Sequence, residues 1–266
     1  MNFKKIFLLT LLTFSLLGVS IMGQKTMAQE SSSKLDDILT RGYLLVGTTG
    51  DFKPMSYYNT TTGTYEGFDI EATQMLADSL GVKVKFVKTT WPTLMQDTLD
   101  GKFDIAMSGI TRTFARQQKV DLSHGYIEFG KTALMRKADI KKYPNLEAIN
   151  KKGVRVGVNP GGTNEKFVRQ YLTNVEIIVH QKNVEIPDMV ASGKVDIMIT
   201  DSMEAVRYTK DDARLAAPLL NNLFTQNKFG IMMKRGDQDF LNYINMWMEE
   251  MELRGEFKRM EAKYIQ

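Results

Sequence analysis

The chain has 266 residues, of which 43% are hydrophobic and 25% charged. This composition is typical of a globular protein and argues against long disorder, collagen-like repeats or a coiled coil. The sequence contains no cysteine and only two histidines, His124 and His180. These counts exclude structural disulfides, thiolate metal sites, a cysteine nucleophile and the lipid-bearing cysteine of a lipoprotein, and they disfavour a metalloenzyme.

The first residues follow the layout of a secretory signal. Met1–Lys5 is basic, Ile6–Met22 is apolar or small, and Thr26–Ala28 offers the small residues that a signal peptidase needs. A single membrane anchor is the alternative, although the apolar run contains Thr10 and other small or polar residues. We expect residues 1–28 to be a cleaved signal peptide and the mature protein to be periplasmic or secreted, without membrane insertion.

The net charge changes when this segment is removed. Residues 1–28 carry three lysines and no acids, so the formal net charge falls from +4 to +1. The remaining chain mixes both signs of charge and lacks the basic stripe that is typical of nucleic-acid binding. We therefore expect a small-molecule partner and no nucleic acid.

The next hundred residues alternate between helical and extended patterns. The spacing of apolar residues and the positions of Gly81 and Pro92 predict the element boundaries. The expected helices are Leu35–Arg41, Asp69–Leu80 and a helix after Pro92 that reaches Leu99, and the expected strands are Tyr43–Thr48, Val82–Val87 and Phe103–Met107.

The pattern then begins again. The expected strands are Lys131–Met135, Val154–Val158, Val175–His180, Asp196–Thr200 and Phe229–Met233. The expected helices are Asn164–Leu172, Val184–Ser192, one that starts at Ser202, Asp237–Glu252 and Glu256–Tyr264. Alternation of strands and helices predicts an α/β protein with mainly parallel sheets flanked by helices.

Two similar lobes fit this order best. We expect lobe 1 to comprise residues 35–130 together with 225–266, because the strand at Phe229–Met233 can return to the first sheet. Lobe 2 then comprises residues 131–224. A cleft between two lobes is the expected place for a ligand.

The most informative segment runs from Val156 to Phe167 and contains Asn159, Gly162 and Thr163. A strand ends, two glycines turn the chain, and a helix begins, which builds an anion site from exposed N–H groups. The segment lacks the Lys-Ser/Thr ending of a nucleotide P-loop, so a carboxylate is the better ligand. The alternative is a plain turn capped by Thr163.

A second strand-to-helix segment carries two acids, Asp201 and Glu204. Glu204 lies three positions after Asp201, which is the spacing between the N-cap and N3 residues of a capping box. The alternative is that both carboxylates face a ligand at the carboxyl edge of the sheet. The local pattern alone favours the capping box.

Other polar and aromatic residues follow predicted strands. Arg116, after Ser108–Thr111, is suited to a bidentate contact with a carboxylate, or it is a solvated surface residue beside Lys119. Trp91 is suited either to a pocket wall or to the core.

These segments together resemble the type II periplasmic solute-binding proteins that capture amino acids (extracellular solute-binding family 3). The resemblance covers about the whole mature chain and rests on Gly67-Phe68-Asp69, on Phe103–Ile110 and on Arg116 before Asp121-Leu122-Ser123. It implies a two-lobed fold with the ligand in the interlobe cleft.

Within that family, four segments are most similar to the cyclohexadienyl dehydratases, exported carbon–oxygen lyases that convert prephenate or L-arogenate to phenylpyruvate or phenylalanine. These segments are Thr48–Asp51, Thr90–Pro92, Asn159–Phe167 and Thr200–Ala205. Phe52 and Met55 depart from the pattern, since an aromatic hydroxyl and a phenylalanine are expected at these positions.

The resemblance implies a role for individual residues. Glu204 matches the general acid, and no metal or organic cofactor is required because aromatisation of the ring drives the reaction. Substrate contacts are expected from Asp51, Trp91, Ser108, Ile110, Arg116, Lys131, Asn159, Gly162, Thr163 and Asp201.

The alternative is a non-catalytic amino-acid receptor of an ABC uptake transporter. Its arginine and aspartate, which hold the ligand carboxylate and ammonium, match Arg116 and Asp201, but receptors typically have no acid at the position of Glu204. A dicarboxylate or an amino acid is thus the expected ligand, and the protein is a possible homo-oligomer.

Overall fold

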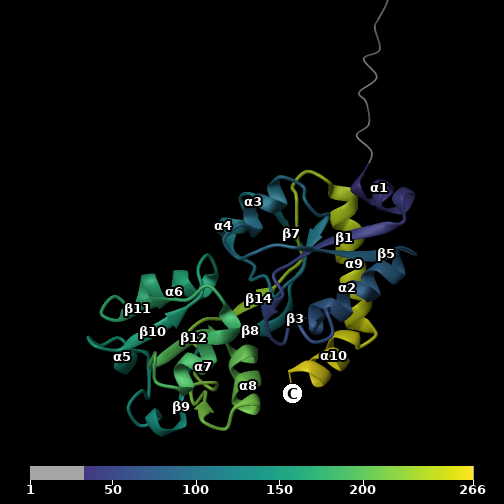
Figure 1. Ribbon diagram of the computed structural model, residues 1–266. Helices are drawn as coiled ribbons and strands as arrows, with labels where there is room; N and C mark the ends of the chain where they lie inside the picture. Colours follow the sequence, from purple (N-terminus) through teal and green to yellow (C-terminus); the bar gives the residue numbers. More distant parts are fainter. Residues whose placement is uncertain (1–32, 266) are drawn as a thin grey trace, which may run out of the picture. The chain divides into compact units, whose positions relative to one another are not determined.

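The structure is a computed structural model that describes residues 33–265 (Figure 1). The expected signal peptide, residues 1–28, lies outside the described residues. Within them, no helix has the length and apolar character needed to cross a membrane. Residues 33–265 belong to one compact unit, and two five-stranded sheets define its two lobes.

The sheet of lobe 1 has the order β5-β1-β6-β15-β7. Its strands are β5 (Lys83–Lys88), β1 (Tyr43–Thr48), β6 (Ile105–Ala106), β15 (Met232–Met233) and β7 (Asp121–Leu122). The sheet of lobe 2 has the order β11-β10-β12-β9-β13. Its strands are β11 (Glu176–Val179), β10 (Arg155–Val158), β12 (Ile197–Asp201), β9 (Lys131–Arg136) and β13 (Leu215–Ala216).

Each sheet contains one reversed strand, at the fourth place in its order. In lobe 1, β15 is antiparallel to both β6 and β7, and the other four strands run in one direction. In lobe 2, β9 has the same relation to β12 and β13. The reversed strands are the ones that enter a lobe from the other one, so the crossings between the lobes set this shared topology.

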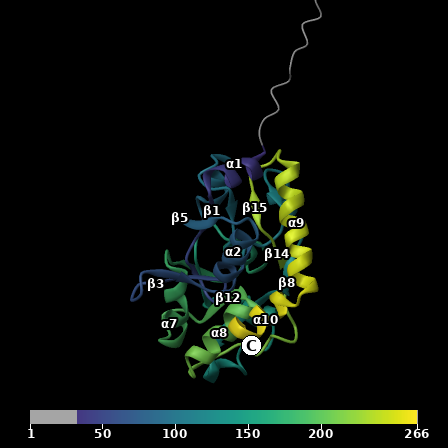
Figure 2. The ribbon, with the colours of Figure 1, turned by 90° about the vertical axis from the view of Figure 1, so that its right-hand side faces the viewer.

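Helices flank both sheets (Figures 1 and 2). Around the first sheet lie α1 (Lys34–Arg41), α2 (Phe68–Ser79), α3 (Leu94–Leu99), α4 (Phe114–Gln117), α9 (Gln238–Leu253) and α10 (Glu256–Tyr264). Around the second lie α5 (Leu146–Ile149), α6 (Thr163–Tyr171), α7 (Ile186–Ala191) and α8 (Ser202–Asp211). Short 3₁₀ turns occupy η1 (Lys137–Asp139) and η2 (Asn183–Glu185).

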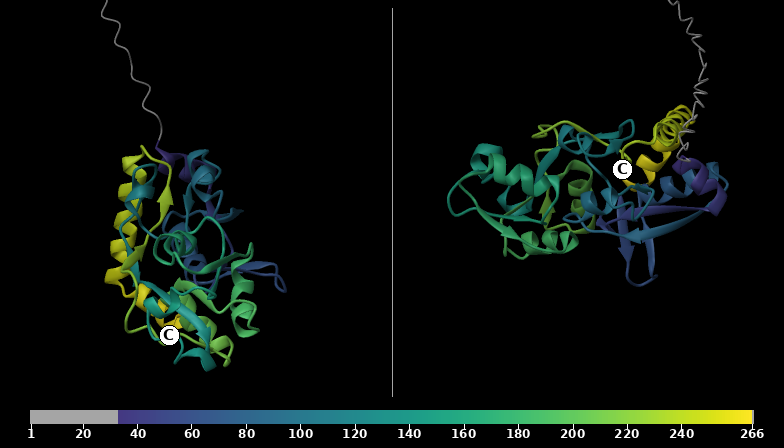
Figure 3. Two further views of the ribbon diagram at one scale, coloured as in Figure 1. Left: turned by 90° about the vertical axis from the view of Figure 1, so that its left-hand side faces the viewer. Right: turned by 90° about the horizontal axis from the view of Figure 1, so that it is seen from above.

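The late helices return to the first lobe. α9 contacts α1, and α10 contacts α2. Seen from above, the two lobes lie side by side (Figure 3). The grouping of residues 225–266 with 35–130 stays a prediction, and so do the exact lobe boundaries.

Most of the predicted elements are confirmed to within a few residues. The strand predicted at Phe229–Met233 is wrong as a single element, because the chain leaves extended pairing at Gly230-Ile231 and forms two separate strands, β14 (Asn227–Phe229) and β15. At Gly230 a Cβ would lie 2.7 Å from Cγ of Arg112. An antiparallel sheet of β2 (Asp51–Phe52), β3 (Ser56–Asn59) and β4 (Thr64–Glu66) was not predicted.

Two chain crossings connect the lobes. β8 (Tyr126–Phe129) leads into β9, and β14 lies antiparallel to β8 on the way back. The pairing is irregular, since Lys228 faces Glu128 but Phe229 faces Tyr126. Ile127 is therefore the extra residue of a β-bulge, and its φ is +43°. We call β8 and β14 the hinge strands.

Burial on both faces explains why lobe 2 forms a stable sheet. All five residues of β12 are buried, with Ile197 and Ile199 in one apolar cluster and Met198 in another. A strand covered on both faces consists of a continuous apolar run, because neither side chain direction reaches water. Polar Thr200 and Asp201 follow at the end of this run, where the strand reaches the cleft.

At the opposite end of β12, the buried carboxylate of Asp196 connects this strand to β10 and β9. Asp196 accepts hydrogen bonds from the backbone and side chain of Arg155 (2.9–3.1 Å) and from Nη2 of Arg136 (3.0 Å). Burial alone raises the pKa of Asp196, but the hydrogen bonds from Arg155 and Arg136 outweigh it and lower the pKa to about 2.

We predict that Asp196→Asn destabilises the protein at pH 7 by about 2 kcal/mol, since one pKa unit corresponds to about 1.36 kcal/mol. Because the pKa of Asp196 is lowered in the folded protein, its carboxylate stabilises the fold at pH values above the unfolded pKa of 3.8. This contribution is lost as the pH falls through the folded pKa. Denaturant unfolding at several pH values should therefore show a difference from wild type that shrinks below pH 4. The exposed control Asp239→Asn should show no such trend, and a gap that stays constant with pH would contradict the assignment.

Candidate functional site

Several strands end at the cleft between the lobes. In lobe 1, β1 ends at Thr48 and is followed by Asp51, and in lobe 2, Asn159 follows β10 while Asp201 ends β12. Open α/β sheets present ligand-binding groups at the carboxyl ends of their strands. The predicted site residues therefore gather from both lobes at this cleft.

A small cavity lies at the centre of the cleft. Its volume is about 20 Å³, which is room for about one water molecule. Both lobes contribute to the wall, which is formed by Phe52, Trp91, Gly109 and Thr111 from lobe 1 and by Asn159, Gly162, Thr163, Asn164, Asn183 and Asp201 from lobe 2. A ring-bearing ligand needs more space, so it requires the lobes to move apart.

Direct contacts close the cleft around this cavity. Nδ2 of Asn183 donates to the backbone oxygen of Asp51 (3.2 Å), and the hydroxyls of Thr111 and Thr163 lie 3.3 Å apart. The turn at Gly161-Gly162, which we call the glycine turn, approaches lobe 1 closely. A Cβ on Gly161 would lie 2.6 Å from the nitrogen of Pro92. The structure thus shows the closed arrangement of the two lobes.

Glu204 is fully buried beneath the cavity wall. It lies in the first turn of α8, and its Oε1 accepts a hydrogen bond from Nδ2 of Asn183 (2.6 Å). Its Oε2 is bonded to the hydroxyl of Thr200. The N-cap residue Asp201 makes no side-chain cap bond, so the capping box that the local pattern favoured is wrong.

The surroundings of Glu204 favour its protonated form. Burial raises the pKa of Glu204 to about 8, the hydrogen bonds from Thr200 and Asn183 oppose the shift, and the nearby charge of Asp201 adds to it. At neutral pH most of the population therefore carries a proton on this carboxyl group. A protonated carboxyl group beside a ligand cavity is equipped to act as a general acid.

Asp201, unlike Glu204, lies beside positively charged side chains. Nζ of Lys131 lies 2.5 Å from Oδ1 of Asp201, and both side chains are almost fully buried. The same Nζ also donates to Thr163 (2.8 Å) and to Asn164 (2.5 Å). Burial raises the pKa of Asp201, and the charges of Lys131 and Arg116 act against this shift. Lys131 therefore organises the wall of lobe 2.

Arg116 is held by a short capped helix. Thr113 caps α4 through its hydroxyl, which accepts from the Arg116 backbone N–H (3.2 Å), and Nη1 of Arg116 donates to the Thr111 backbone oxygen (2.6 Å). Burial lowers the pKa of Arg116 to about 10, so the guanidinium stays charged at neutral pH. This partly buried cation beside the cavity is not the solvated surface arginine of the alternative interpretation.

The glycine turn has the geometry of an open helix N-terminus. Gly162 is the N-cap of α6 and makes no side-chain cap bond, while Gly161 has a φ of +83°. The interpretation of Thr163 as the cap is wrong, because Thr163 is the first helical residue and its hydroxyl contacts Lys131. Gly162 and Thr163 therefore face the cavity with uncapped backbone at the start of the helix.

Trp91 forms part of both the cavity wall and the core. Its Nε1 donates to Oδ1 of Asp51 (2.9 Å), and its ring makes an edge contact with Phe52 at a centroid distance of 5.9 Å. It also packs against two apolar clusters of lobe 1. Burial raises the pKa of Asp51, against the hydrogen bonds from Thr49 and Trp91.

Five of the ten predicted contact residues do not line the cavity. Asp51, Arg116 and Lys131 bond to residues of its wall, whereas Ser108 and Ile110 contact other parts of lobe 1. Ser108 is fully buried, and its hydroxyl bonds to Ser56 (2.5 Å) and Thr49 (2.8 Å). The side chain of Ile110 packs in an apolar cluster, while its backbone oxygen accepts from Gly230 (2.9 Å). In this closed structure both residues support the cleft loop 108–111, and direct contact with a ligand remains a prediction for them.

Sequence reasoning missed Asn183, which bonds to Glu204 and to the other lobe. It follows β11 by a few residues, in the same sheet-edge position as Asn159 and Asp201. The strand-end rule that selected those two residues could have selected it. Thr111 and Asn164 were likewise inside segments that the sequence singled out, but without a role of their own.

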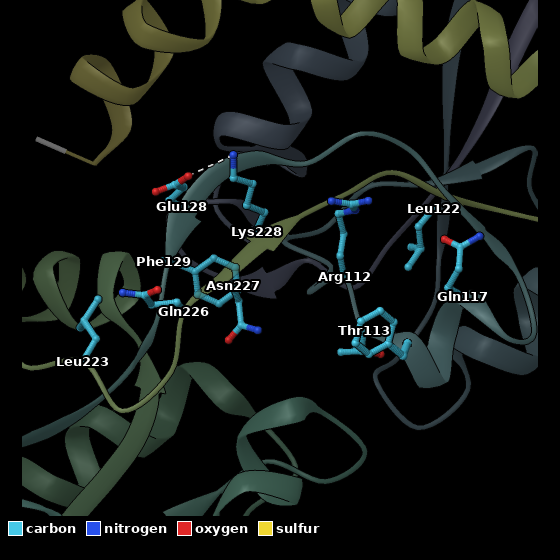
Figure 4. A pocket seen from close by; sticks show the side chains of 11 residues that line it. Arg112, Thr113, Gln117, Leu122, Glu128, Phe129, Leu223, Gln226, Asn227 and Lys228 are labelled. Carbon is cyan, nitrogen blue, oxygen red and sulfur yellow. Dashed lines mark ion pairs between the residues drawn. The ribbon is translucent and has the colours of Figure 1, made fainter.

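A larger hollow of about 780 Å³ lies beside the hinge strands. Figure 4 shows Arg112, Thr113 and Gln117 on one side of it, and Phe129, Asn227 and the ion pair of Glu128 with Lys228 (3.0 Å) on the other. None of the predicted site residues lines this hollow. The acid, the paired charges and the helix N-terminus all lie at the smaller cavity, which is therefore the better candidate site.

Comparison with known proteins gives the class to which this fold and cleft belong. Residues 44–266 match the model of the bacterial extracellular solute-binding proteins, family 3, and the chain belongs to that family. It is 42% identical over 88% of its length to a cyclohexadienyl dehydratase from Pseudomonas aeruginosa, 87% of which is covered. It is also 26% identical over 93% of its length to an L-cystine-binding protein from Escherichia coli, 91% of which is covered.

Solved structures give the same picture. An ancestral amino acid-binding protein described as a precursor of cyclohexadienyl dehydratase has a TM-score of 0.81 at 37% identity, covering 88% of this chain and all of its own. An ancestral cyclohexadienyl dehydratase has a TM-score of 0.56 at 53% identity, covering 88% of this chain and 97% of its own. The two-lobed fold of periplasmic binding proteins is thereby confirmed.

Gly162→Val tests whether the glycine turn binds a ligand. The φ of −88° and ψ of −180° at Gly162 suit a β-branched residue, and the first contacts of a Cβ there are at 3.8 and 3.9 Å. The fold should therefore survive, while the valine methyl groups fill the cavity. We predict at least a 10-fold weaker apparent affinity for the cleft ligand, corresponding to about 1.4 kcal/mol.

Ligand titration and thermal unfolding, measured together, check this prediction. Gln170→Val places the same side chain on the exposed face of α6 and serves as the matched control. Unchanged affinity in Gly162→Val would remove the turn from the site.

Proposed function

We propose that this protein is an exported cyclohexadienyl dehydratase, which converts prephenate to phenylpyruvate, L-arogenate to phenylalanine, or both. The observation that carries the proposal is the buried Glu204, whose pKa is raised to about 8 at the cleft where this family binds solutes. A solute receptor has no need of a proton donor at this position. The 42% identical dehydratase relative supports the same function.

The chemistry requires one proton and a ring that can become aromatic. Glu204 donates its proton to the ring hydroxyl of the substrate, the C–O bond breaks, and water leaves. The electron pair of the bond to the ring carboxylate enters the ring as carbon dioxide departs. The residual Glu204 carboxylate is reprotonated from solvent when the cleft opens, which completes the cycle with all atoms accounted for.

Cations and N–H groups of the cleft are placed to hold the substrate carboxylates. Arg116 on the lobe 1 side and Lys131 on the lobe 2 side are the charged donors, and the backbone around Gly162 and Thr163 offers neutral ones. Trp91 and Phe52 supply apolar surface for the ring. Because Phe52 has no hydroxyl, it contributes packing and no hydrogen bond.

Closure of the lobes is part of the proposed mechanism. The closed cavity of about 20 Å³ is too small for the substrate, so binding requires opening. The two ancestral structures agree with a hinge motion: the one with 53% identity superimposes less well (TM-score 0.56) than the one with 37% identity (0.81). Rotation of two similar lobes lowers the superposition without a change of fold, and closing excludes water from the reacting atoms.

The family and the pattern of the first residues support an extracytoplasmic place of action. Members of this family are extracellular solute-binding proteins, and we propose that cleavage near Ala28 releases the chain into the periplasm or the medium. The oligomeric state stays a prediction.

The second candidate function is an amino-acid receptor for an ABC transporter. It is favoured by the charge arrangement, since Arg116 can hold a carboxylate while Asp201 can hold an ammonium group, and by the amino-acid-binding relatives. In this structure, however, Lys131 already neutralises Asp201 at 2.5 Å. A ligand ammonium therefore has to compete with a buried lysine.

Glu204→Gln separates the two functions. Glutamine keeps the size of the side chain and its hydrogen bonds to Thr200 and Asn183, but it has no acidic proton to donate. We predict that kcat with prephenate falls by about 10²–10⁴-fold and that KM changes little. The appearance of phenylpyruvate, followed by its absorbance, is the measurement.

Glu185→Gln is the matched control, because Glu185 is a half-buried acid near Asn183 that pairs with Lys182 (2.7 Å) and its loss should leave kcat unchanged. Wild-type protein that binds an amino acid tightly by calorimetry but leaves prephenate and L-arogenate intact would assign the chain to the receptor class.

A further inference from the structure

A second buried acid, Asp69, lies behind the cavity wall. Asp69 is fully buried in the first turn of α2, and its backbone N–H donates to the Met55 oxygen (2.9 Å). Its Oδ2 accepts the backbone N–H of Gly109, and its Oδ1 accepts the hydroxyl of Tyr126 (2.8 Å). One carboxyl group thus bonds both to a residue of the cavity wall and to a residue of a hinge strand.

The Gly109 end of this connection fixes the cleft loop. Gly109 has a φ of +63°, and a Cβ there would lie 2.3 Å from the Phe52 ring. The loop therefore turns sharply against an aromatic residue of the cavity wall. The bond to Asp69 holds the backbone of this turn, which continues into Thr111, and the Thr111 backbone oxygen accepts a hydrogen bond from Arg116 (2.6 Å).

The Tyr126 end fixes the hinge. Tyr126 stacks on Phe68 at a centroid distance of 5.9 Å and is only 4% exposed. The next residue, Ile127, is the bulged residue with a φ of +43°. A β-branched residue in this conformation is strained by about 1–2 kcal/mol, and such strain persists only where the surroundings hold it.

We propose that Asp69 is a positioning residue that ties the cleft loop to the strained hinge bulge, so that the substrate-binding groups of lobe 1 keep their place relative to the hinge as the lobes close. Asp69 touches no ligand in this scheme. It acts through Gly109 on one side and through Tyr126 on the other. A residue of this kind affects how well the closed cleft forms and leaves the proton transfer from Glu204 unchanged.

Both protonation states of Asp69 preserve the connection. Burial raises the pKa of Asp69 to about 7, against the hydrogen bonds from Gly109 and Tyr126. The carboxylate accepts both hydrogen bonds. The carboxylic acid still accepts from Gly109 through one oxygen and donates to the Tyr126 oxygen through the other. An asparagine can make the same two bonds, which supplies a conservative variant for the test.

The test compares four variants by kcat and KM with prephenate. Tyr126→Phe removes only the hydroxyl and should raise KM by about 10-fold, the upper value for one ordinary hydrogen bond, with kcat within about 2-fold of wild type. Asp69→Leu should raise KM at least as much. Asp69→Asn should stay within about 3-fold of wild type. The control Asp104→Asn alters a buried acid that holds Leu45 N–H (2.8 Å) and Arg41, and it should lower Tm without a change in KM.

Ile127→Gly adds a test of the hinge itself. Glycine adopts a positive φ without strain, so the bulge no longer needs an anchor. In the Ile127→Gly background, Tyr126→Phe should raise KM by less than about 3-fold. Equal effects of Tyr126→Phe in both backgrounds would overturn the link to the bulge, and a wild-type KM in Tyr126→Phe alone would overturn the proposal.

The proposal does not depend on the dehydratase chemistry, because any ligand that binds by closing the cleft requires the same connection. If the wild-type protein does not turn prephenate over, a calorimetric screen of the twenty L-amino acids identifies a ligand. Its Kd then replaces KM, with the same order of variants expected. Failure of the proposed function and failure of this inference are therefore separate results.

Discussion

The cleft is organised by a carboxyl group that is buried without a cation. Glu204 bonds to the neutral groups of Thr200 and Asn183. The positive charges of the site are directed elsewhere, since Lys131 pairs with Asp201 and Arg116 bonds to Thr111. An ionised carboxylate in such a place is costly, and binding a proton is the least costly way to relieve it. Glu204 thus keeps its proton because Lys131 and Arg116 are bonded to other groups.

This arrangement depends on the lobes being closed. Asn183 joins Glu204 in lobe 2 to the backbone of Asp51 in lobe 1, so the groups that cover the acid come from both sides of the cleft. Under the proposed function, opening gives the Glu204 carboxylate access to protons from solvent, and burial on closing restores the raised pKa that retains the proton. Closing removes the water and strengthens every electrostatic interaction of the site. Under the proposed function, closing of the lobes therefore supplies the desolvation that acid catalysis needs.

The fold could be predicted from the sequence to a large extent, because apolar periodicity indicates the type of each element and turn residues indicate where it ends. The repeated order of strands and helices predicts two sheets, and it even places the return of the chain to lobe 1 near residue 229. The split between β14 and β15 could not be predicted, because between them Gly230 bonds to Ile110 and Ile231 bonds to Ser123, contacts that no local pattern contains. The site was harder. The Asp201–Glu204 spacing is the same for a capping box and for a catalytic acid, and only the tertiary neighbours distinguish them.

The same limit applies to the rest of the site. Thr163 has the residue type of an N-cap, yet Lys131, more than thirty residues earlier in the chain, engages its hydroxyl. Ser108 was selected for its position after a strand, but its hydroxyl faces Ser56 inside lobe 1. Strand ends thus indicate where a site lies, whereas the direction of each side chain is set by long-range contacts that no local pattern contains.

The protonation state of Glu204 tests the central claim most directly. Protein labelled with ¹³C at the glutamate carboxyl carbons can be titrated by NMR, with Glu204→Gln used to assign the Glu204 signal. The account predicts one glutamate signal that titrates near the pKa of about 8 and that is missing from the variant. A Glu204 signal that titrates at or below the ordinary value of 4.5 would contradict the account, because the residue would then be ionised at neutral pH and unable to act as the acid.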